Sequence, residues 1–322
     1  MSHIYLTHAL PGKRIAELGQ HCDMDCWSGP GLLPADRLRL ALAAADGVVC
    51  LLTDRIDAAL LAAAPRLRFI SSVSVGLDHV DLEAATGRGI PVGHTPGVLV
   101  DATADTAFAL LLAAARRIAE ADAFVRGGHW RPETAWSPDF FLGRDLAGAT
   151  LGLVGLGAIA RAVARRAAAF GMRVVAWNRS PRTVPGVEVL PLDDVLAASD
   201  FVSVHVALAP QTRGLLDAQR LAQLRPGAVL INTARGGIVD EAALADALIS
   251  GHLGGAGLDV YEREPLPAES PLLTAPNTVL APHIGSATAL TRRRMADLAA
   301  ANALAALRGE RMPHCANPAV YE

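Results

Sequence analysis

The sequence has little of what marks secreted, membrane or nucleic-acid-binding proteins. Its 322 residues include only four cysteines, whose spacing shows no disulfide framework. The net charge is −3, so no basic face for a nucleic acid or a membrane surface is expected. The longest apolar run, residues 102–115, is interrupted by Asp105 and is too short for a bilayer span. The first residues lack the basic start and apolar core of a signal peptide, so we expect a cytoplasmic protein.

One stretch, residues 21–26 (HCDMDC), gathers side chains that can bind a metal. Zinc ligands usually come as two spaced pairs, and the sequence shows no second pair. We therefore expect no metal site there, and interpret Cys22 and Cys26 as free thiols near a loop.

The sequence is instead rich in apolar segments, and β-rich and helical segments alternate regularly along it. Hydrophobic residues make up 52% and charged residues 19%, which favours a globular fold, and the length favours two domains. Short β-rich runs alternate with helical segments, a pattern typical of parallel α/β sheets. In the first block the pattern predicts helices at 35–45 and 57–64 and strands at 4–8, 48–52, 69–73 and 91–94.

The middle of the chain differs from both ends. Residues 98–126 contain almost no strong helix breaker, and residues 107–115 are apolar all round, which predicts a helix buried on several sides. Residues 127–148 predict an ordered, aromatic-rich connection, with Trp130, Trp136 and Phe140 among its residues. A second α/β block and a last helix at 288–307 follow; its predicted strands are 151–154, 173–177, 201–205, 228–232, 255–260 and 278–281.

The second block opens with a glycine motif between a strand and a helix. The strand leads into the hexamer GLGAIA, which is the G-x-G-x-x-A form of the dinucleotide fingerprint. Gly155 permits the tight turn, Gly157 lets the backbone approach a pyrophosphate at the helix N-terminus, and Ala160 still permits close packing. We expect the cofactor to contact Gly155, Leu156, Gly157, Ala158 and Ile159. The alternative is a tight turn that binds nothing.

The residue that follows the second strand of this block predicts which dinucleotide is bound. An acidic residue is due there to bond the ribose hydroxyls and repel a 2′-phosphate. The sequence has Asn178 instead, followed by Arg179, Ser180 and Arg182, which offer guanidinium groups and a hydroxyl to a phosphate. We therefore predict that NADP(H) is preferred and that NAD(H) is possible. The alternative is that these arginines are solvated surface charges.

Three polar residues follow three other strands of the second block. Arg235, Glu264 and His283 each come just past a strand, where ligands bind in open α/β sheets. Separately, they could be an ion pair, a surface charge and a helix cap. Together they form a plausible hydride-transfer site: Arg235 grips a carboxylate and polarises a carbonyl, and His283 is the general acid. Glu264 would hold the imidazole and favour its protonated form.

At this point a resemblance to a known family appears. The motifs GLGAIA, NTARGGIVDEAAL, GLDVYEREP and APHIGSAT, with SVGLDHVDLEAATGRGIPVGHTPGV in the first block, resemble those of the D-isomer-specific 2-hydroxyacid dehydrogenases over essentially the whole chain. The resemblance implies a homodimer with a flavodoxin-like substrate domain (1–98 and 288–322) and a Rossmann-type NAD(P)-binding domain (99–287). It also implies that Arg235, Glu264 and His283 are catalytic.

The resemblance implies further binding residues. Asp259 is expected near the nicotinamide carboxamide and Thr212 along the cofactor. The further cofactor contacts that it implies are His205, Thr233, Ala234 and Gly285. The substrate carboxylate is expected at the backbone of Val75 and Gly76, in a small pocket walled by Leu51 and Leu52, with Arg235 and His283 as the other contacts.

Within the family, the chain is most similar to glyoxylate/hydroxypyruvate reductases, in which NADPH use is common. This predicts a reductase of short 2-oxoacids. A 2-ketogluconate reductase or another D-2-hydroxyacid dehydrogenase stays open as an alternative, and so does a dinucleotide-sensing, corepressor-like binding protein. We also put forward the hypothesis that the connection around Trp136 and Phe140 reaches the active site of the partner subunit.

Overall fold

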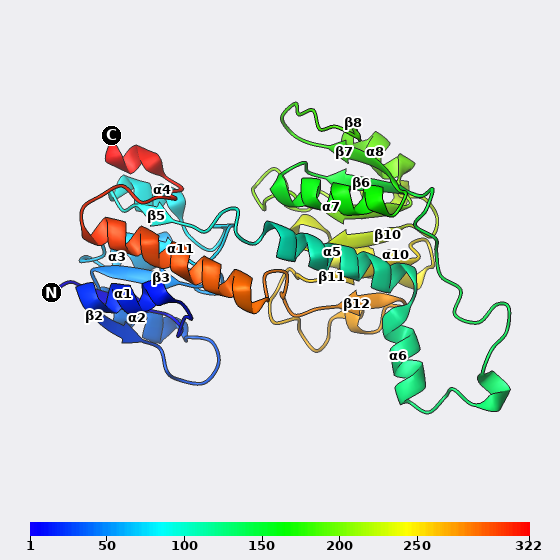
Figure 1. The fold of residues 1–322 in the computed structure, drawn as a ribbon, viewed down its shortest axis with the longest axis horizontal. Coiled ribbons are helices and arrows are strands. Elements are labelled where there is room, and N and C mark those ends of the chain that lie inside the picture. Colours follow the sequence, from blue (N-terminus) through cyan, green and yellow to red (C-terminus); the bar gives the residue numbers. More distant parts are fainter. The chain divides into compact units, whose positions relative to one another are not determined.

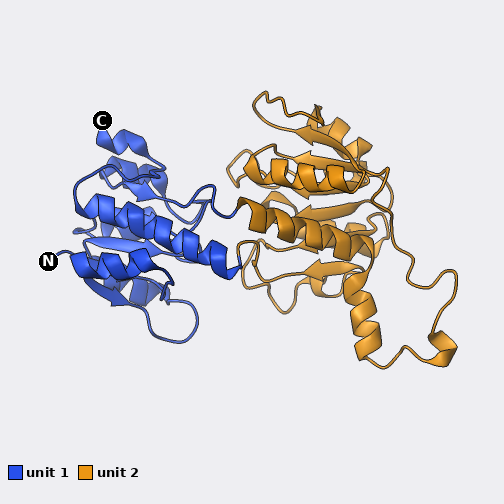
Figure 2. Cartoon of the chain, in the orientation of Figure 1, with its two compact units in different colours: residues 1–99, 287–322 blue, residues 100–286 orange.

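The chain folds into two compact units, which are coloured blue and orange in Figure 2. The computed structural model describes all 322 residues. Unit 1 comprises Met1–Leu99 and Ala287–Glu322, and unit 2 comprises Val100–Ser286. Both divisions lie one residue away from the boundaries that the sequence predicts. This division rests on backbone contacts, whereas the binding of the substrate by unit 1 and of the cofactor by unit 2 is predicted from side-chain chemistry.

Unit 1 is built on a five-stranded parallel sheet in the order β2-β1-β3-β4-β5. This is the flavodoxin-like strand order, as predicted. Every residue of the two strands β3 and β4 is buried, so the sheet must be covered on both faces. The strands are β1 (His3–Leu6), β2 (Asp23–Cys26), β3 (Gly47–Cys50), β4 (Phe69–Ser72) and β5 (Val92–Gly93).

The last long helix of the chain belongs to unit 1. Helix α11 (Ala289–Leu307) buries Ala299 and Ala303 and packs against β3, β4 and α1 (Figure 1). Ser71 on β4 donates its hydroxyl to the carbonyl of Ala299, 2.8 Å away. The small alanine side chains let the helix approach the sheet closely. The other helices of this unit are α1 (Lys13–His21), α2 (Ala35–Ala44), α3 (Ala58–Ala62), α4 (Leu82–Gly87) and the 3-10 helix η4 (Pro318–Tyr321).

Within the stretch at residues 21–26, His21 is the last residue of α1, and residues 23–26 form a strand that we did not predict. Asp23–Cys26 pairs in parallel with β1 as the edge strand β2. Three of its four residues are exposed, so the strand has no apolar face for the sequence to reveal. Charged edge strands of this kind discourage pairing with other chains. Cys22 is buried and Cys26 exposed, and all four cysteines of the chain are free.

Unit 2 is built on a seven-stranded parallel sheet in the order β12-β11-β10-β9-β6-β7-β8. The chain runs outward from β6 to β8 and then returns to place β9 on the other side of β6. This is the Rossmann-type order, and its switch point lies between β6 and β9. The strands are β6 (Thr150–Val154), β7 (Arg173–Trp177), β8 (Val187–Val189), β9 (Phe201–Val204), β10 (Val229–Asn232), β11 (Gly255–Leu258) and β12 (Thr278–Leu280). Only the short, largely exposed β8 was not predicted.

The segment at residues 98–126 forms two helices, where we expected one. Helix α5 (Val100–Ala115) buries most of its middle residues, as predicted, and α6 (Ile118–Arg126) buries none. The break lies at Arg117, whose φ of 54° is in the left-handed region. Arg117 donates to Glu120 across 2.6 Å, and its guanidinium lies 5.0 Å from the centre of the Phe141 ring. These contacts stabilise a conformation that no helix breaker in the sequence announces.

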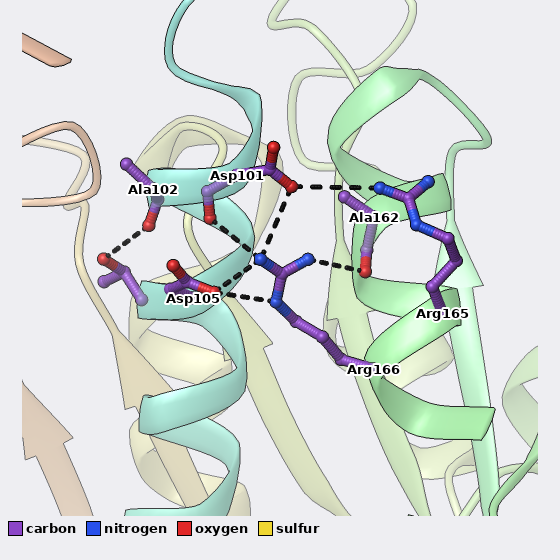
Figure 3. Close-up of polar contacts among 7 residues, drawn as sticks. Asp101, Ala102, Asp105, Ala162, Arg165 and Arg166 are labelled. Carbon is purple, nitrogen blue, oxygen red and sulfur yellow. Dashed lines mark hydrogen bonds and ion pairs between the residues drawn. The ribbon is translucent and has the colours of Figure 1, made fainter. Parts of the chain in front are cut away.

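Helix α7 (Ala158–Ala169), which begins at the glycine motif, is tied to α5 by an arginine (Figure 3). The Arg166 guanidinium donates to one carboxylate oxygen of Asp105 from Nε at 2.8 Å and from Nη2 at 2.5 Å. Its Nη1 donates to the carbonyl of Ala162 on its own helix. Arg165 is 3.8 Å from Asp101 and mostly exposed. Arg166 therefore joins the helix that begins at the glycine motif to α5.

The remaining helices of unit 2 cover the sheet or extend from it. They are α8 (Leu192–Ala198), α9 (Ala218–Gln223), α10 (Glu241–Ile249) and the 3-10 helices η1 (Pro132–Thr134), η2 (Gly236–Ile238) and η3 (Pro271–Leu273). No helix of the chain combines the length and the apolar character that a membrane span needs.

Residues 118–143 project from the body of unit 2, and we call them the arm (Figure 1). Phe124 on α6 packs against Phe140 and Phe141 at ring-centre distances of 5.6 and 5.3 Å, so aromatic contacts order the connection, as expected. Trp130 and Trp136 remain 60% and 79% exposed. The arm therefore presents large apolar side chains to solvent.

Candidate active site

The glycine motif lies at the switch point of the unit 2 sheet. Gly155 follows β6 directly and has a φ of +103°, a region that side chains rarely adopt. A Cβ atom there would lie 2.8 Å from the carbonyl oxygen of His205, so the segment after β9 requires a glycine. Gly157 is the N-cap of α7, whose amide groups point toward the loop. Ala160 is fully buried in the core.

Two observations fit a bound dinucleotide at this loop. A Cβ atom on Gly157 would meet no atom within 4 Å, so the packing of the protein does not require this glycine. A pyrophosphate approaching the helix N-terminus would require it. Thr233, which follows β10, is 8% exposed, and its hydroxyl oxygen is buried without a hydrogen-bond partner in the protein. Buried hydroxyls are normally satisfied, so this one fits a ligand contact.

Asn178 joins the glycine motif to the segment that follows β7. Its Oδ1 accepts from the Leu156 N–H at 3.0 Å, and its Nδ2 donates to the Ser180 carbonyl at 2.7 Å. Arg182 donates from Nη1 to the Leu156 carbonyl at 3.4 Å. Arg179, Ser180 and Arg182 lie at the surface beside the loop. The Asn178 amide therefore holds a polar surface segment next to the glycine motif.

His205 and Thr212 lie in the segment after β9. Ser203 and the Nε2 atom of His205 are hydrogen-bonded at 2.9 Å, and desolvation lowers the pKa of the imidazole to about 4. His205 is therefore neutral at pH 7. The Thr212 hydroxyl donates to Ala207 and accepts from the Ala209 N–H, so it closes its own loop. Whether either residue contacts the cofactor stays a prediction.

Arg235 follows β10 at the start of η2. Asn232, at the end of the strand, shapes this turn: its side chain accepts from the Ala234 N–H and donates to the Arg235 carbonyl. The charge of Arg235 acts on Glu264 and helps to lower the pKa of that carboxyl. Asn232 was not among the predicted site residues. Its position directly before Thr233 in the NTAR motif could have indicated that it belongs to the site.

His283 is held by the end of β11. Its backbone N–H donates to the carbonyl of Asp259, and its φ of 54° lies in the left-handed region. The Asp259 carboxylate, 1% exposed, accepts from the N–H groups of Ile284 and Gly285, both at 2.7 Å. Burial raises the pKa of Asp259, and the two N–H groups only partly offset it. Asp259 therefore fixes the backbone on which His283 stands.

Glu264 and His283 form a hydrogen-bonded pair. The Oε2 atom of Glu264 lies 2.7 Å from Nδ1 of His283, and Oε1 accepts from the Tyr261 N–H at 3.1 Å. Burial alone would raise the pKa of Glu264, but the hydrogen bond and charge of His283, with smaller contributions from the Tyr261 N–H and Arg235, outweigh burial and lower the pKa. Both side chains are about three-quarters buried, with His283 22% and Glu264 28% exposed. The carboxylate orients the ring and leaves Nε2 as the atom that can exchange a proton.

The predicted substrate residues of unit 1 follow two neighbouring strands of its sheet. Leu52 comes just after β3, and Val75 and Gly76 come after β4. The Ser74 hydroxyl donates to the Gly76 carbonyl at 2.8 Å and so shapes this loop. The contacts of these three residues with a substrate stay predictions. No group of three or more metal-ligating side chains occurs in the chain.

Together, the fold and the side chains define a class of protein. A Rossmann-type sheet, a glycine motif at its switch point and a carboxylate-held histidine past the strand ends are the parts of a dinucleotide-dependent dehydrogenase.

The comparisons with known proteins identify the family. Residues 108–285 match the family model described as "D-isomer specific 2-hydroxyacid dehydrogenase, NAD binding domain". The glyoxylate reductase of Korarchaeum cryptofilum is 44% identical over 99% of this chain and 97% of its own length. That of Thermococcus litoralis is 45% identical over 98% and 96%. The chain therefore belongs to the D-isomer-specific 2-hydroxyacid dehydrogenase family.

Solved structures agree with this result. A protein of Thermus thermophilus superposes with a TM-score of 0.91 at 48% identity, covering 98% of this chain and 99% of that one. The NADPH-dependent glyoxylate/hydroxypyruvate reductase of Sinorhizobium meliloti, solved with NADP and malonate, has a TM-score of 0.85 at 35% identity, covering 98% and 96%. The chain is an NAD(P)-dependent 2-hydroxyacid dehydrogenase, and a bound nicotinamide supplies or accepts the hydride.

Proposed function

We propose that this protein is an NADPH-preferring reductase of short 2-oxoacids, converting glyoxylate to glycolate and hydroxypyruvate to D-glycerate. The observation that carries the proposal is the segment from Asn178 to Arg182, which has no carboxylate and is hydrogen-bonded to the glycine motif. Relatives named glyoxylate reductase, at about 44% identity over nearly the full chain, support the substrate class.

The cofactor preference rests on charge. An acidic residue in place of Asn178 would repel a 2′-phosphate, whereas Arg179 and Arg182 attract one. Both arginines lie at the surface, and the hydrogen bonds of Asn178 keep the backbone that carries them close to the loop. The Sinorhizobium meliloti relative, described as NADPH-dependent and solved with NADP, supports the same preference.

The proton-transfer roles rest on the Glu264–His283 pair. In the proposed reaction His283 gives its Nε2 proton to the carbonyl oxygen of the 2-oxoacid, and it takes the proton back in the reverse direction. Glu264 stabilises the imidazolium through the 2.7 Å hydrogen bond. Arg235 binds the substrate carboxylate and polarises the carbonyl. The backbone of Val75 and Gly76, with Leu52, is proposed to complete the binding of the small acid.

We also propose that the enzyme is a homodimer. Support comes from the arm, where α6 buries none of its residues and Ile118, Val125 and Leu142 are more than half exposed. Large exposed apolar patches usually mark interaction surfaces. The hypothesis that Trp136 reaches the partner's active site has a direct test: Trp136→Ala should then change KM or kcat.

One experiment tests the activity and the cofactor together. Initial rates are measured with glyoxylate, hydroxypyruvate, pyruvate and 2-ketogluconate, each with NADPH and with NADH. We expect the highest kcat/KM with glyoxylate or hydroxypyruvate and NADPH. A higher value with NADH would overturn the cofactor preference. Turnover of 2-ketogluconate alone would reassign the substrate, and no oxidation at high enzyme concentration would favour a dinucleotide-sensing binding protein.

Substitutions in the 178–182 segment test which residues set the preference. Arg182→Ala and Asn178→Asp should each lower kcat/KM for NADPH roughly ten- to a hundredfold, the worth of a charge-assisted hydrogen bond, with little change for NADH. Arg173→Ala is a matched control, because Arg173 is an exposed arginine on β7 that pairs with Glu188. Equal losses with both cofactors would mean that the segment does not recognise the 2′-phosphate.

A further inference from the structure

Glu241 lies outside the catalytic set and contacts the backbone that carries Glu264. It is the first residue of α10, and its Oε1 accepts from the N–H of Glu262 at 2.5 Å. Glu262 lies in the turn from Tyr261 to Glu264, which is closed by the hydrogen bond from the Tyr261 N–H to Oε1 of Glu264. The Glu241 carboxylate therefore anchors this turn to a helix.

A second contact joins the same two segments. Gly236, between Arg235 and α10, presses on the turn so closely that a Cβ atom there would lie 1.8 Å from the carbonyl carbon of Tyr261. Tyr261 in turn donates its hydroxyl to the carbonyl of Ala281, 3.0 Å away and two residues before His283. The segment after β10, the turn after β11 and the loop after β12 thus form one connected block.

The carboxylate of Glu264 has no freedom to compensate for a shift of this turn. One of its oxygens is taken by the Tyr261 N–H and the other faces His283. A displacement of about 1 Å at Glu264 would lengthen the 2.7 Å bond to the imidazole beyond hydrogen-bonding range. The anchoring of the turn therefore decides whether the pair forms.

We propose that Glu241 is a positioning residue for the Glu264–His283 pair: its carboxylate holds the Tyr261–Glu264 turn so that Glu264 faces the imidazole. This inference rests on the proposed function for its catalytic meaning, but not for its geometry. The charged or titratable groups around the pair are Arg235 after β10, Asp259 and Tyr261 after β11, Glu262 in the turn, and Glu241 on α10.

Glu241 could instead act only on its own helix, since a carboxylate in the first turn stabilises the helix dipole. Two conservative variants separate these roles. Glu241→Gln keeps an oxygen acceptor at the same reach and removes the charge. Glu241→Asp keeps the charge and shortens the reach by one methylene. A positioning role predicts that the Gln variant is close to the wild type and that the Asp variant is impaired; a helix-dipole role predicts the reverse.

The decisive measurement is the titration of the His283 imidazole by NMR, assigned by the resonance missing in His283→Gln. Without a well-placed Glu264 the imidazolium loses its counter-ion, so the titration midpoint in Glu241→Asp and Glu241→Ala should move about half a pH unit or more to lower pH. Glu241→Gln should titrate like the wild type. Unchanged midpoints in the Asp and Ala variants would overturn the proposal.

Enzyme kinetics provide the second readout. In Glu241→Asp, kcat/KM for the 2-oxoacid should fall roughly tenfold, and the alkaline limb of its pH profile should move in the same direction as the NMR midpoint. A Gln variant as impaired as the Asp variant would count against the role of the acceptor. Because the NMR titration needs no substrate, a wild-type enzyme that does not reduce glyoxylate would refute the proposed function without touching this inference.

Discussion

At the scale of single residues, the site is built by carboxylates that hold backbone. Asp259 binds the two N–H groups that follow His283, and Glu264 binds the N–H of Tyr261 while it orients the imidazole. The left-handed conformation of His283 is uncommon outside glycine, and the bonds of Asp259 stabilise it. The buried carboxylate of Asp259, at the end of the neighbouring strand β11, therefore fixes the backbone conformation of His283.

The first prediction concerns His283 itself. His283→Ala should lower kcat for 2-oxoacid reduction roughly 10²- to 10⁴-fold, because it removes the proposed proton donor. The dissociation constant for NADPH, measured by fluorescence titration, should change much less. Glu264→Gln keeps a hydrogen-bonding side chain without its charge and should give an intermediate loss. A near-normal kcat/KM in the Ala variant would show that another group donates the proton.

The second prediction concerns acid stability and His205. The pKa of His205 is about 4 in the folded state, below the ordinary histidine value near 6.5, so the unfolded chain binds the extra proton between these values. Stability should therefore fall as the pH drops from about 6.5 to about 4, by on the order of 3 kcal/mol from this residue. Urea unfolding midpoints at several pH values should fall less in His205→Asn; parallel losses would exclude His205 as the cause.

At the scale of elements, the strand–loop–helix unit β6–α7 separates folding requirements from binding requirements. Gly155 is needed by the fold, because its φ is positive and the segment after β9 crowds it. Gly157 has an ordinary extended conformation and open space around it. The two glycines of the motif are therefore required for different reasons: Gly155 for the fold, and Gly157 for the expected binding of the cofactor.

This difference gives a matched pair of variants. Gly157→Ala should keep the melting temperature of the wild type and weaken NADPH binding roughly tenfold or more, since the added methyl occupies the approach to the pyrophosphate. Gly155→Ala should lower the melting temperature by several degrees, because it adds both a clash and backbone strain. Calorimetry and cofactor titration check both. Undiminished NADPH binding by the Gly157 variant would remove the loop from the cofactor site.

The contact between α5 and α7 makes a second prediction at this scale. Arg166 is 24% exposed and makes two short hydrogen bonds to Asp105, whereas Arg165 is 68% exposed and lies 3.8 Å from Asp101. Arg166→Ala should cost about 1 kcal/mol and lower the melting temperature by roughly 2–4 °C. The adjacent Arg165→Ala should change it by less than about 1 °C, as exposed pairs do. Equal effects would mean that the Arg166 network stabilises the protein no more than the exposed Arg165 pair does.

At the scale of the whole molecule, the arm is the surface through which we propose that the chain forms a dimer. Helix α6 has no buried residue. A short helix of this kind needs either a partner that covers its apolar side chains or sufficient stabilising contacts within the chain. We expect the protein to sediment as a dimer, at twice the 33.5 kDa mass of the chain. Leu142→Asp, at a 63% exposed position of the arm, should shift the distribution toward monomer, whereas Leu40→Asp, at a 66% exposed position on α2, should not. A monomeric wild type at micromolar concentration would refute the dimer.

Some parts of this molecule could be predicted from the sequence alone because they depend on local chemistry. An apolar segment followed by glycines and a helical segment is compatible with few structures other than a strand, a tight turn and a helix. The order of residues is therefore enough to locate the β6–α7 unit and its motif. The same holds for the places of Arg235, Glu264 and His283, each just past a strand. Parallel strands bring their carboxyl ends to one edge, and that rule is sufficient to bring Glu264 and His283 together.

Other parts were decided only by tertiary structure, because they depend on partners elsewhere in the chain. The polar strand β2 exists because β1 offers it an edge, and Arg117 breaks a helix because Glu120 and Phe141 hold it. The bonds of Asn178 to the glycine motif and of Glu241 to Glu262 join residues about twenty positions apart. The sequence was enough to name the groups that we propose for the chemistry. Long-range hydrogen bonds, which leave no local pattern, decided how those groups are held.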